Sequence, residues 1–377
     1  MTSPTPGESP AVPPCPRARP EVETLTAYSA PLEGRRGLLR LDFNENTVGP
    51  SPRVVEAIRA IPADHYAIYP EYDGLREAVV RSLGGRGLTP AHIGLFNGVD
   101  AAIHAVFHAF GSPGDRLLTT SPTFGYYTPC ARMQGMVIEA IPYRLPDFAF
   151  PFEAIRAALE APGTAAAAPR ILLICNPNNP TGTRLAPERI LELAAAAQDT
   201  LVVVDELYEA FTGDSVLPVA DFAAFPNLLV LRSLAKTAGL AGLRIGFAIG
   251  APALVERVGR VCGPYDINSF AVTAAHAALA DQAYVDGYVA EVLRARDRLV
   301  TQLRQAGVRH HAAGGNYLLL WPRRPAAAVE ADLRQAGILV RSMAGKPLID
   351  GSLRVSLGTG AQMERFWEAY RRIDGLG

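Results

Sequence analysis

The pattern of apolar and polar positions is most regular between residues 93 and 249. Here short apolar runs alternate with longer segments of helical periodicity, which is typical of βαβ units and of a mostly parallel sheet covered on both faces. Helical patterns lie over 101–110 and 187–197, for example. Seven runs are candidate strands: residues 93–96, 116–119, 137–141, 171–175, 201–204, 228–231 and 245–249. The predicted fold class is α/β, with a large lobe built on a seven-stranded, mostly parallel sheet.

The pattern changes at both ends of this stretch. From residue 275 it predicts a long amphipathic helix over 284–307 and strands at 317–321 and 353–357, which indicates a smaller α+β lobe. The first twenty residues contain seven prolines and no apolar stretch, so we expect a disordered tail and not a signal peptide. The expected organisation is a proline-rich disordered tail over 1–24, an N-terminal arm and part of the small domain over 25–52, a large domain over 53–274 and a small C-terminal domain over 275–377.

Composition and charge narrow the classes of function. The formal net charge is −1 and no long run of basic residues occurs, which argues against a nucleic-acid partner. No apolar run reaches membrane-spanning length, so we expect no membrane association. The four cysteines are far apart and form no C-x-x-C pair, which fits a reducing cytoplasm and no metal cage. His104 and His108 have the i, i+4 spacing of metal ligands but no apparent third ligand, so we expect no metal.

Lysine is rare in this chain. Among 36 basic residues only Lys236 and Lys346 are lysines. Arginine keeps its proton in proteins and cannot form an imine, so each lysine is a candidate for chemistry that needs a primary amine. Lys346 lies in Ala-Gly-Lys-Pro, which predicts a loop in which this lysine is exposed to solvent. Lys236 lies between apolar and glycine-rich stretches. Composition alone does not choose between them.

Polar residues follow several of the predicted strands. In open α/β sheets ligands collect outside the carboxyl ends of the strands. Here those ends are followed by the segments Asn97-Gly-Val-Asp100, Asn176-Pro-Asn-Asn179-Pro-Thr-Gly182, Asp205-Glu-Leu-Tyr208 and Arg232-Ser-Leu-Ala-Lys236. The first of these is a glycine turn that leads into a helix N-terminus, where free N–H groups favour a phosphate. Each segment alone could be an ordinary cap or ion pair, but their convergence predicts a site.

Together these motifs resemble the fold-type I pyridoxal-phosphate aminotransferases of class I and II. The resemblance rests on N-P-x-N-P-T-G, D-E-x-Y and S-x-x-K followed by G-L-R, in this order along most of the chain. It implies that Lys236 binds the cofactor as a Schiff base, that Asp205 pairs with the pyridine nitrogen, and that Asn179 and Tyr208 bind the ring oxygen. It further implies a stacking ring from Phe124, phosphate contacts from Val99, Asp100, Ser233 and Arg244, and a phosphate contact from Tyr69 of the second subunit of a homodimer. Arg354 would bind the α-carboxylate of an amino acid, as a bidentate guanidinium can.

Within this group the sequence is most similar to the histidinol-phosphate aminotransferases. Three stretches carry this likeness: Leu-Thr-Ala-Tyr28-Ser-Ala, Leu41-Asp-Phe-Asn44-Glu-Asn ahead of Gly-Pro-Ser-Pro, and Val-Arg341. The resemblance implies that Tyr28 and Arg341 contact the substrate phosphate and that Asn44 lies near the substrate. Arg341 could equally bind the γ-carboxylate of glutamate, or be a surface arginine. The chain departs from the usual sequence pattern of this family at Thr47, Phe124, Leu207 and Ala235. These differences are compatible with cofactor binding, but they make the prediction of the substrate less specific.

Four functions follow as hypotheses. The first is ping-pong transamination between glutamate or 2-oxoglutarate and histidinol phosphate or imidazole-acetol phosphate, in histidine biosynthesis. The second changes the substrate to an aromatic amino acid or one of secondary metabolism. The third is a lyase or decarboxylase with the same cofactor. The fourth, a regulator that binds the cofactor without catalysis, would need a DNA-binding segment, and neither the tail nor the C-terminus offers a helix-turn-helix.

Overall fold

The computed structural model describes residues 15–26, 33–160 and 168–376. Tyr28 and most of the predicted proline-rich tail lie outside the described residues. In the described part of the chain, no helix is both long enough and apolar enough to cross a membrane.

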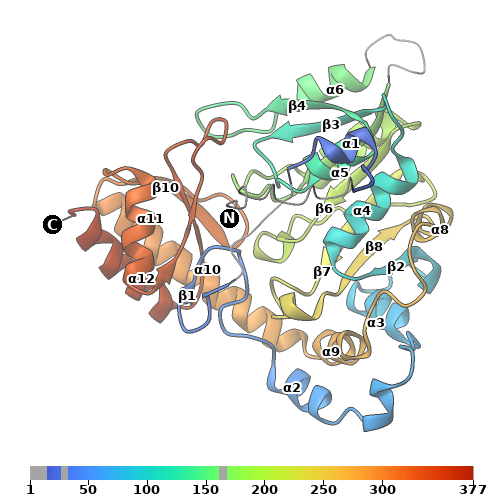
Figure 1. Cartoon of the computed structure of the whole chain (residues 1–377), viewed down its shortest axis with the longest axis horizontal. Coiled ribbons are helices and arrows are strands. Elements are labelled where there is room, and N and C mark those ends of the chain that lie inside the picture. The colour runs from blue at the N-terminus through green and yellow to red at the C-terminus, as the bar shows by residue number, and fades with distance from the viewer. Residues whose placement is uncertain (1–14, 27–32, 161–167, 377) are drawn as a thin grey trace, which may run out of the picture.

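A seven-stranded sheet forms the centre of the large lobe (Figure 1). Its strand order is β2-β8-β7-β6-β5-β3-β4. Strand β8 runs antiparallel to β2 and β7, and the other neighbouring pairs are parallel. The bounds are β2 (Ile93–Phe96), β3 (Arg116–Ser121), β4 (Val137–Pro142), β5 (Pro169–Cys175), β6 (Leu201–Asp205), β7 (Leu228–Ser233) and β8 (Gly246–Gly250). The predicted α/β fold with a seven-stranded, mostly parallel sheet is therefore confirmed.

Helices cover both faces of this sheet, which explains why β5, β6 and β7 read as continuous apolar runs. One face packs against α4 (Val99–Phe110), α5 (Tyr127–Met133) and α8 (Pro252–Gly259), and these elements share one buried apolar cluster. The other face packs against α3 (Leu75–Ser82), α6 (Phe152–Glu160), α7 (Pro187–Ala196) and α9 (Ser269–Leu279). Helix α2 (Pro52–Arg59), capped by the Ser51 side chain, packs on α9.

The smaller lobe is built around a second sheet of order β12-β13-β10-β9, in which all neighbours are antiparallel. A third buried cluster joins this sheet to the long helix α10 and to α11 and α12. The bounds are α10 (Gln282–Gln305), β9 (Arg309–His311), β10 (Tyr317–Trp321), α11 (Ala326–Gln335), β11 (Ile338–Leu339), β12 (Arg341–Ser342), β13 (Leu353–Ser356) and α12 (Gly360–Ile373). Strand β1 (Leu39–Arg40) pairs with β11, so this part of the N-terminal segment packs with the C-terminal lobe.

The structure differs from the sequence expectation at two boundaries. Residues assigned to a disordered tail include α1 (Pro20–Glu23), which starts at a proline in the first helical turn and packs on α5. The boundary between residues 274 and 275 falls inside α9, where Ala274 and Ala275 belong to the same buried cluster of the large lobe. This helix is rich in alanine, so its apolar stripe is too weak to show which lobe it packs against.

Candidate active site

Three polar segments meet at one edge of the large sheet because their strands are in register. Cys175 of β5 lies opposite Asp205 of β6, which lies opposite Leu231 of β7. The segments that follow these positions carry Asn179, Tyr208 and Lys236. The sheet thus brings together residues that are up to about 60 positions apart in the sequence, as expected for the carboxyl ends of parallel strands.

A hydrogen-bond network joins this edge to the small lobe and to the N-terminal segment. The Tyr208 hydroxyl accepts hydrogen bonds from Asn44 Nδ2 at 3.1 Å and from Asn179 Nδ2 at 3.4 Å. Arg354 of β13 donates from Nη1 to Asn179 Oδ1 at 2.7 Å. Asn44 has a φ of 55° and is fixed by Ser356, whose hydroxyl bonds both its backbone N–H and its Oδ1. Burial raises the pKa of Tyr208, so its hydroxyl keeps its proton.

Asp205 is a buried carboxylate without a recorded ion pair in the described residues. It is 2% exposed, accepts a hydrogen bond from the Tyr127 hydroxyl at 2.6 Å and another from Leu207 N at 3.2 Å. Desolvation raises the pKa of Asp205 to about 6, against the opposing effect of the Tyr127 hydrogen bond. A buried carboxylate in this state favours a cationic partner, such as a protonated ring nitrogen.

The next residue along the chain, Glu206, is equally buried but already has its partner. Its Oε2 atom accepts from Arg232 Nε at 3.0 Å and from Ser215 Oγ at 2.9 Å, while Oε1 accepts from Val216 N at 2.7 Å. The two adjacent acids therefore differ in function: Glu206 is neutralised within the protein, and Asp205 is available to a ligand.

Lys236 lies beside this network with its amine directed at the N-terminal segment. Its Nζ atom donates to the Phe43 carbonyl at 3.0 Å and lies 5.9 Å from the centre of the Tyr208 ring. Desolvation, reinforced by the Arg354 charge, lowers the pKa of Lys236 to about 8. A fraction of the amine is thus neutral at neutral pH, as a nucleophilic or proton-transferring amine must be.

The N-terminus of α4 forms an anion cradle. Gly98 precedes the helix with a φ of 79°, and a Cβ at this position would lie 2.6 Å from Arg244 Nη2. Arg244 donates to Asp100 Oδ2 at 2.9 Å. Ser233 and Gly246 are cross-strand neighbours in β7 and β8, and a Cβ on Gly246 would lie 2.6 Å from Val99 N. The structure therefore gathers Val99, Asp100, Ser233 and Arg244 where free helix N–H groups favour a phosphate.

The other predicted site residues that the structure describes are Phe124, Arg341 and Tyr69. Phe124 lies next to the site, with its ring 5.4 Å from that of Tyr127 in an edge-on arrangement. Arg341 lies directly across β12 and β13 from Arg354, and its Cζ atom is 5.7 Å from the Phe43 ring centre. Tyr69 is 70% exposed and stacks on Tyr265 at 4.0 Å, and no described contact joins it to the other predicted site residues.

Sequence reasoning missed two residues of this site. Tyr127 holds Asp205 from the first turn of α5, and Phe43 lies against Lys236 and Arg341. Tyr127 has no motif of its own, although its position three residues after Phe124, on a helix that follows β3, could have suggested it. Phe43 carries no polar group, so a search for chemistry by residue type passes over it.

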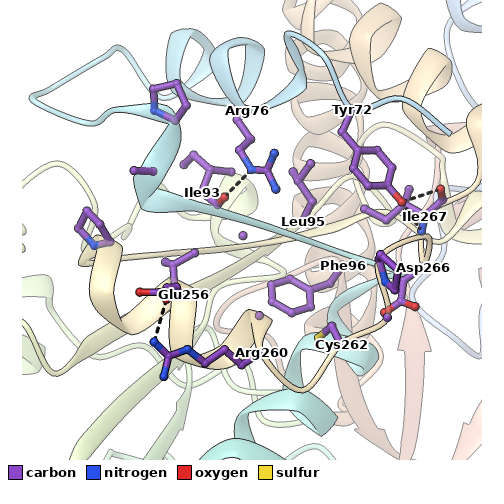
Figure 2. A pocket seen from close by; sticks show the side chains of 18 of the residues that line it. Tyr72, Arg76, Ile93, Leu95, Phe96, Glu256, Arg260, Cys262, Asp266 and Ile267 are labelled. Atoms are coloured by element: carbon purple, nitrogen blue, oxygen red, sulfur yellow. Dashed lines mark hydrogen bonds and ion pairs between the residues drawn. The ribbon is translucent and has the colours of Figure 1, made fainter.

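A large cavity of the described residues lies apart from this site. It has a volume of about 960 Å³ and lies along β2, the outermost strand on one side of the large sheet. Figure 2 shows its apolar floor around Leu95 and Phe96, and the hydrogen bond of 3.1 Å from Arg76 Nε to the Ile93 carbonyl. None of the predicted site residues lines it. In the described residues, no group of three or more His, Cys, Asp or Glu side chains could hold a metal ion.

The fold and these residues define the class of protein, and comparison with known proteins agrees. A family model described as aminotransferase class I and II matches residues 36–369. Histidinol-phosphate aminotransferase 1 of Bordetella parapertussis is 34% identical over 94% of this chain and 98% of its own length. Histidinol-phosphate aminotransferase of Roseiflexus castenholzii is 34% identical over 94% of this chain and 97% of its own length. The structure of histidinol-phosphate aminotransferase from Sinorhizobium meliloti in complex with pyridoxal 5′-phosphate has a TM-score of 0.85, with 25% identity, over 96% of this chain and 99% of that one.

The chain therefore belongs to the class I and II aminotransferases. It is a transaminase, and its cofactor is pyridoxal 5′-phosphate. The family and the relatives favour transamination over the lyase and regulator hypotheses. The residues described above fit this cofactor: a buried carboxylate with no ion pair in the described part of the chain suits a ring nitrogen, a glycine cradle beside Arg244 suits a phosphate, and a lysine with a lowered pKa suits a carbonyl.

Proposed function

We propose that this aminotransferase transfers an amino group between glutamate or 2-oxoglutarate and histidinol phosphate or imidazole-acetol phosphate, in a ping-pong reaction of histidine biosynthesis. The names of the relatives that match 94% of the chain support this choice of substrate. The observation that carries it is Arg341, a guanidinium beside the site with no recorded ion pair in the described residues. Histidinol phosphate has no carboxylate, so its phosphate must supply the anchoring charge.

The residues at the sheet edge would hold the cofactor and move protons. The cofactor supplies an electron sink when it is bound. Lys236 would hold it covalently through Nζ, and the Lys236 amine would move a proton at the substrate Cα. Asp205, held by Tyr127, would pair with the ring nitrogen and favour its protonated form. The other contacts in this proposal are Asn179 and Tyr208 to the ring oxygen, Phe124 to the ring face, and Val99, Asp100, Ser233 and Arg244 to the phosphate.

The substrate would bind between the sheet edge and the small lobe. Arg354, which already lies within hydrogen-bonding distance of Asn179, would donate hydrogen bonds to the α-carboxylate of glutamate. Arg341 and Tyr28 would donate to the distal anion, a phosphate or the γ-carboxylate of glutamate in the other half-reaction. Asn44 lies between these groups and fixes the Tyr208 hydroxyl.

We further infer a homodimer with shared sites in the cytoplasm. Tyr66, Ile68, Tyr69 and Tyr265 form an exposed apolar patch, with Tyr69 at 70% and Tyr66 at 63% exposure. Burial of this patch against a second copy would stabilise a dimer and let Tyr69 reach the phosphate of the other site. The cysteines of the described residues are free thiols, in keeping with a reducing compartment.

The test begins with the absorbance spectrum of the purified protein. We expect a cofactor band that changes on addition of glutamate and is lost in Lys236→Ala. Imidazole-acetol phosphate should then restore the band faster than phenylpyruvate does. Arg341→Ala should reduce kcat/KM for histidinol phosphate by about a hundredfold, the loss expected for a charged hydrogen-bonding partner, and for phenylalanine by much less. Equal losses for the two substrates would contradict the proposed substrate.

A further inference from the structure

The side chain of Phe43 contacts two arginines, Arg35 and Arg341, in the region where we propose that the substrate binds. Its ring centre is 4.1 Å from Arg35 Cζ and 5.7 Å from Arg341 Cζ. Its backbone carbonyl accepts the hydrogen bond from Lys236 Nζ. An apolar residue in the middle of this charged site has no part in the chemistry, so its position needs another explanation.

The two guanidiniums at the ring differ in their partners. Arg35 is bound by Asp42 at 2.7 and 3.0 Å and by Glu45 at 3.0 and 3.1 Å. Arg40 also donates to Glu45 at 3.0 Å, and these contacts lower the pKa of Glu45. Arg35 is therefore fully neutralised, and its charge is not available to a ligand.

Arg341 has the opposite surroundings. No ion pair is recorded for it in the part of the chain that the structure describes, and it lies directly opposite Arg354 across β12 and β13. Like charges in this cross-strand position repel each other. The ring of Phe43 is the recorded contact that attracts the Arg341 guanidinium in this arrangement.

An aromatic ring holds a cation in a way that a carboxylate does not. The face of the ring attracts the guanidinium through its quadrupole and leaves the N–H donors without an acceptor. A carboxylate partner would use the same donors that a substrate anion needs. The ring also fills the space next to Arg35, so its loss would open a route from Arg341 to the carboxylates of Asp42 and Glu45.

We propose that Phe43 is the positioning residue that sets specificity for anionic substrates: its ring holds Arg341 at the site and keeps it from the Asp42 and Glu45 carboxylates. The ligand class is a substrate with a distal carboxylate or phosphate. This inference rests on the proposed function only in that Arg341 binds the substrate anion, and it does not depend on which anion is the natural one.

The test is a double-mutant cycle on the holoenzyme with matched substrates. Glutamate and norvaline share the amino-acid group and the length of the side chain, and only glutamate carries the distal carboxylate. The variants are Phe43→Leu, which keeps apolar volume without a π face, Phe43→Tyr, which keeps the π face, Arg341→Gln, and the Phe43→Leu/Arg341→Gln double variant. The half-reaction with each amino acid is followed by the absorbance of the bound cofactor.

We expect Phe43→Leu to raise KM for glutamate about tenfold, as for a partly desolvated cation–π contact, with kcat changed less than about twofold. KM for norvaline should be unchanged, and Phe43→Tyr should restore KM for glutamate. In the Arg341→Gln background, Phe43→Leu should have no further effect, because the two residues act as one unit. Binding of inorganic phosphate to the holoenzyme, measured by calorimetry, should weaken in Phe43→Leu and in Arg341→Gln.

Two results would overturn the proposal. One is an equal effect of Phe43→Leu on glutamate and norvaline, and the other is an effect of Phe43→Leu that persists in the Arg341→Gln background. Either result would show that Phe43 acts through general packing and not through Arg341. Failure of the proposed function is seen separately, as wild-type enzyme that reacts with glutamate and does not turn over histidinol phosphate. That outcome leaves the Phe43 cycle with glutamate fully informative.

Discussion

The two halves of the active site are built in different ways. The proposed cofactor half comes from the ends of neighbouring strands of one sheet: Asp205 is the last residue of β6, and Lys236 lies three residues after the end of β7. The proposed substrate half comes from three distant segments, represented by Asn44, Arg341 and Arg354, and the two arginines lie on neighbouring strands of the second sheet. The hydrogen bonds of Asn179 and Tyr208 to Arg354 and Asn44 connect the halves.

The two kinds of construction predict which properties should vary together. The register of a buried parallel sheet leaves little freedom, so the cofactor half is rigid and its residues serve every substrate alike. The substrate half can change one segment at a time, and each change alters the preference among substrates. Mutations in the first half should therefore affect all substrates equally, and mutations in the second should discriminate.

The largest effect is expected for Lys236→Ala. Removal of the amine should reduce turnover by about 10⁴-fold or more for every substrate, as for other residues that form covalent bonds and move protons. Turnover with glutamate and with a neutral amino acid, measured side by side, checks this. Lys346→Ala is the matched control and should retain wild-type activity. A substrate-dependent loss in Lys236→Ala would break the distinction between the halves.

Arg354→Ala should come next, and in the other half. We expect kcat/KM for amino acids to fall by about 10²- to 10³-fold, because a bidentate contact with a carboxylate is lost. The dissociation constant of the cofactor, measured by fluorescence titration, should change by less than about threefold. If cofactor affinity falls as much as kcat/KM, the two halves are one unit.

Asp205 should make the cofactor-free protein sensitive to pH. Burial raises the pKa of Asp205 to about 6, whereas the carboxyl of an unfolded chain titrates near pH 4. The folded state then binds the proton more tightly, so stability falls as pH rises from about 4 to about 6, by at most about 3 kcal/mol. Urea unfolding of wild type and Asp205→Asn over this range measures the difference, which parallel curves would contradict.

Tyr127→Phe should have the smallest effect. It removes one buried hydrogen bond of 2.6 Å from Asp205, which corresponds to about 1 to 1.5 kcal/mol. We expect the dissociation constant of the cofactor to rise about five- to twelvefold, with no preference among substrates. Tyr126→Phe, one residue away, is the control. A selective effect of Tyr127→Phe on one substrate would place this residue in the substrate half.

Particular residues show how far sequence reasoning reached. The seven strands of the large sheet were predicted to within one or two residues, because most of them are buried and leave a continuous apolar run, whereas the short strands β1, β9, β11 and β12 were not predicted. Asp205, Lys236 and Gly98 became candidates because polar residues or a glycine turn follow such runs. Tyr127 and Phe43 were missed, since nothing in a tyrosine on a helix or an apolar residue in a loop tells which group it will contact.

Local periodicity was enough to predict the class of fold and the seven strands of the large sheet, whereas the cofactor was implied by the resemblance of the motifs at the strand ends to a known family. Tertiary contacts, and not the sequence, show that Glu206 is neutralised by Arg232 and Arg35 by Asp42 and Glu45, whereas Asp205 and Arg341 have no ion pair within the described residues. In both cases the two residues compared carry the same charge and differ in their partners. Those partners come from other elements of the fold, so the availability of a charge is a property of the folded chain.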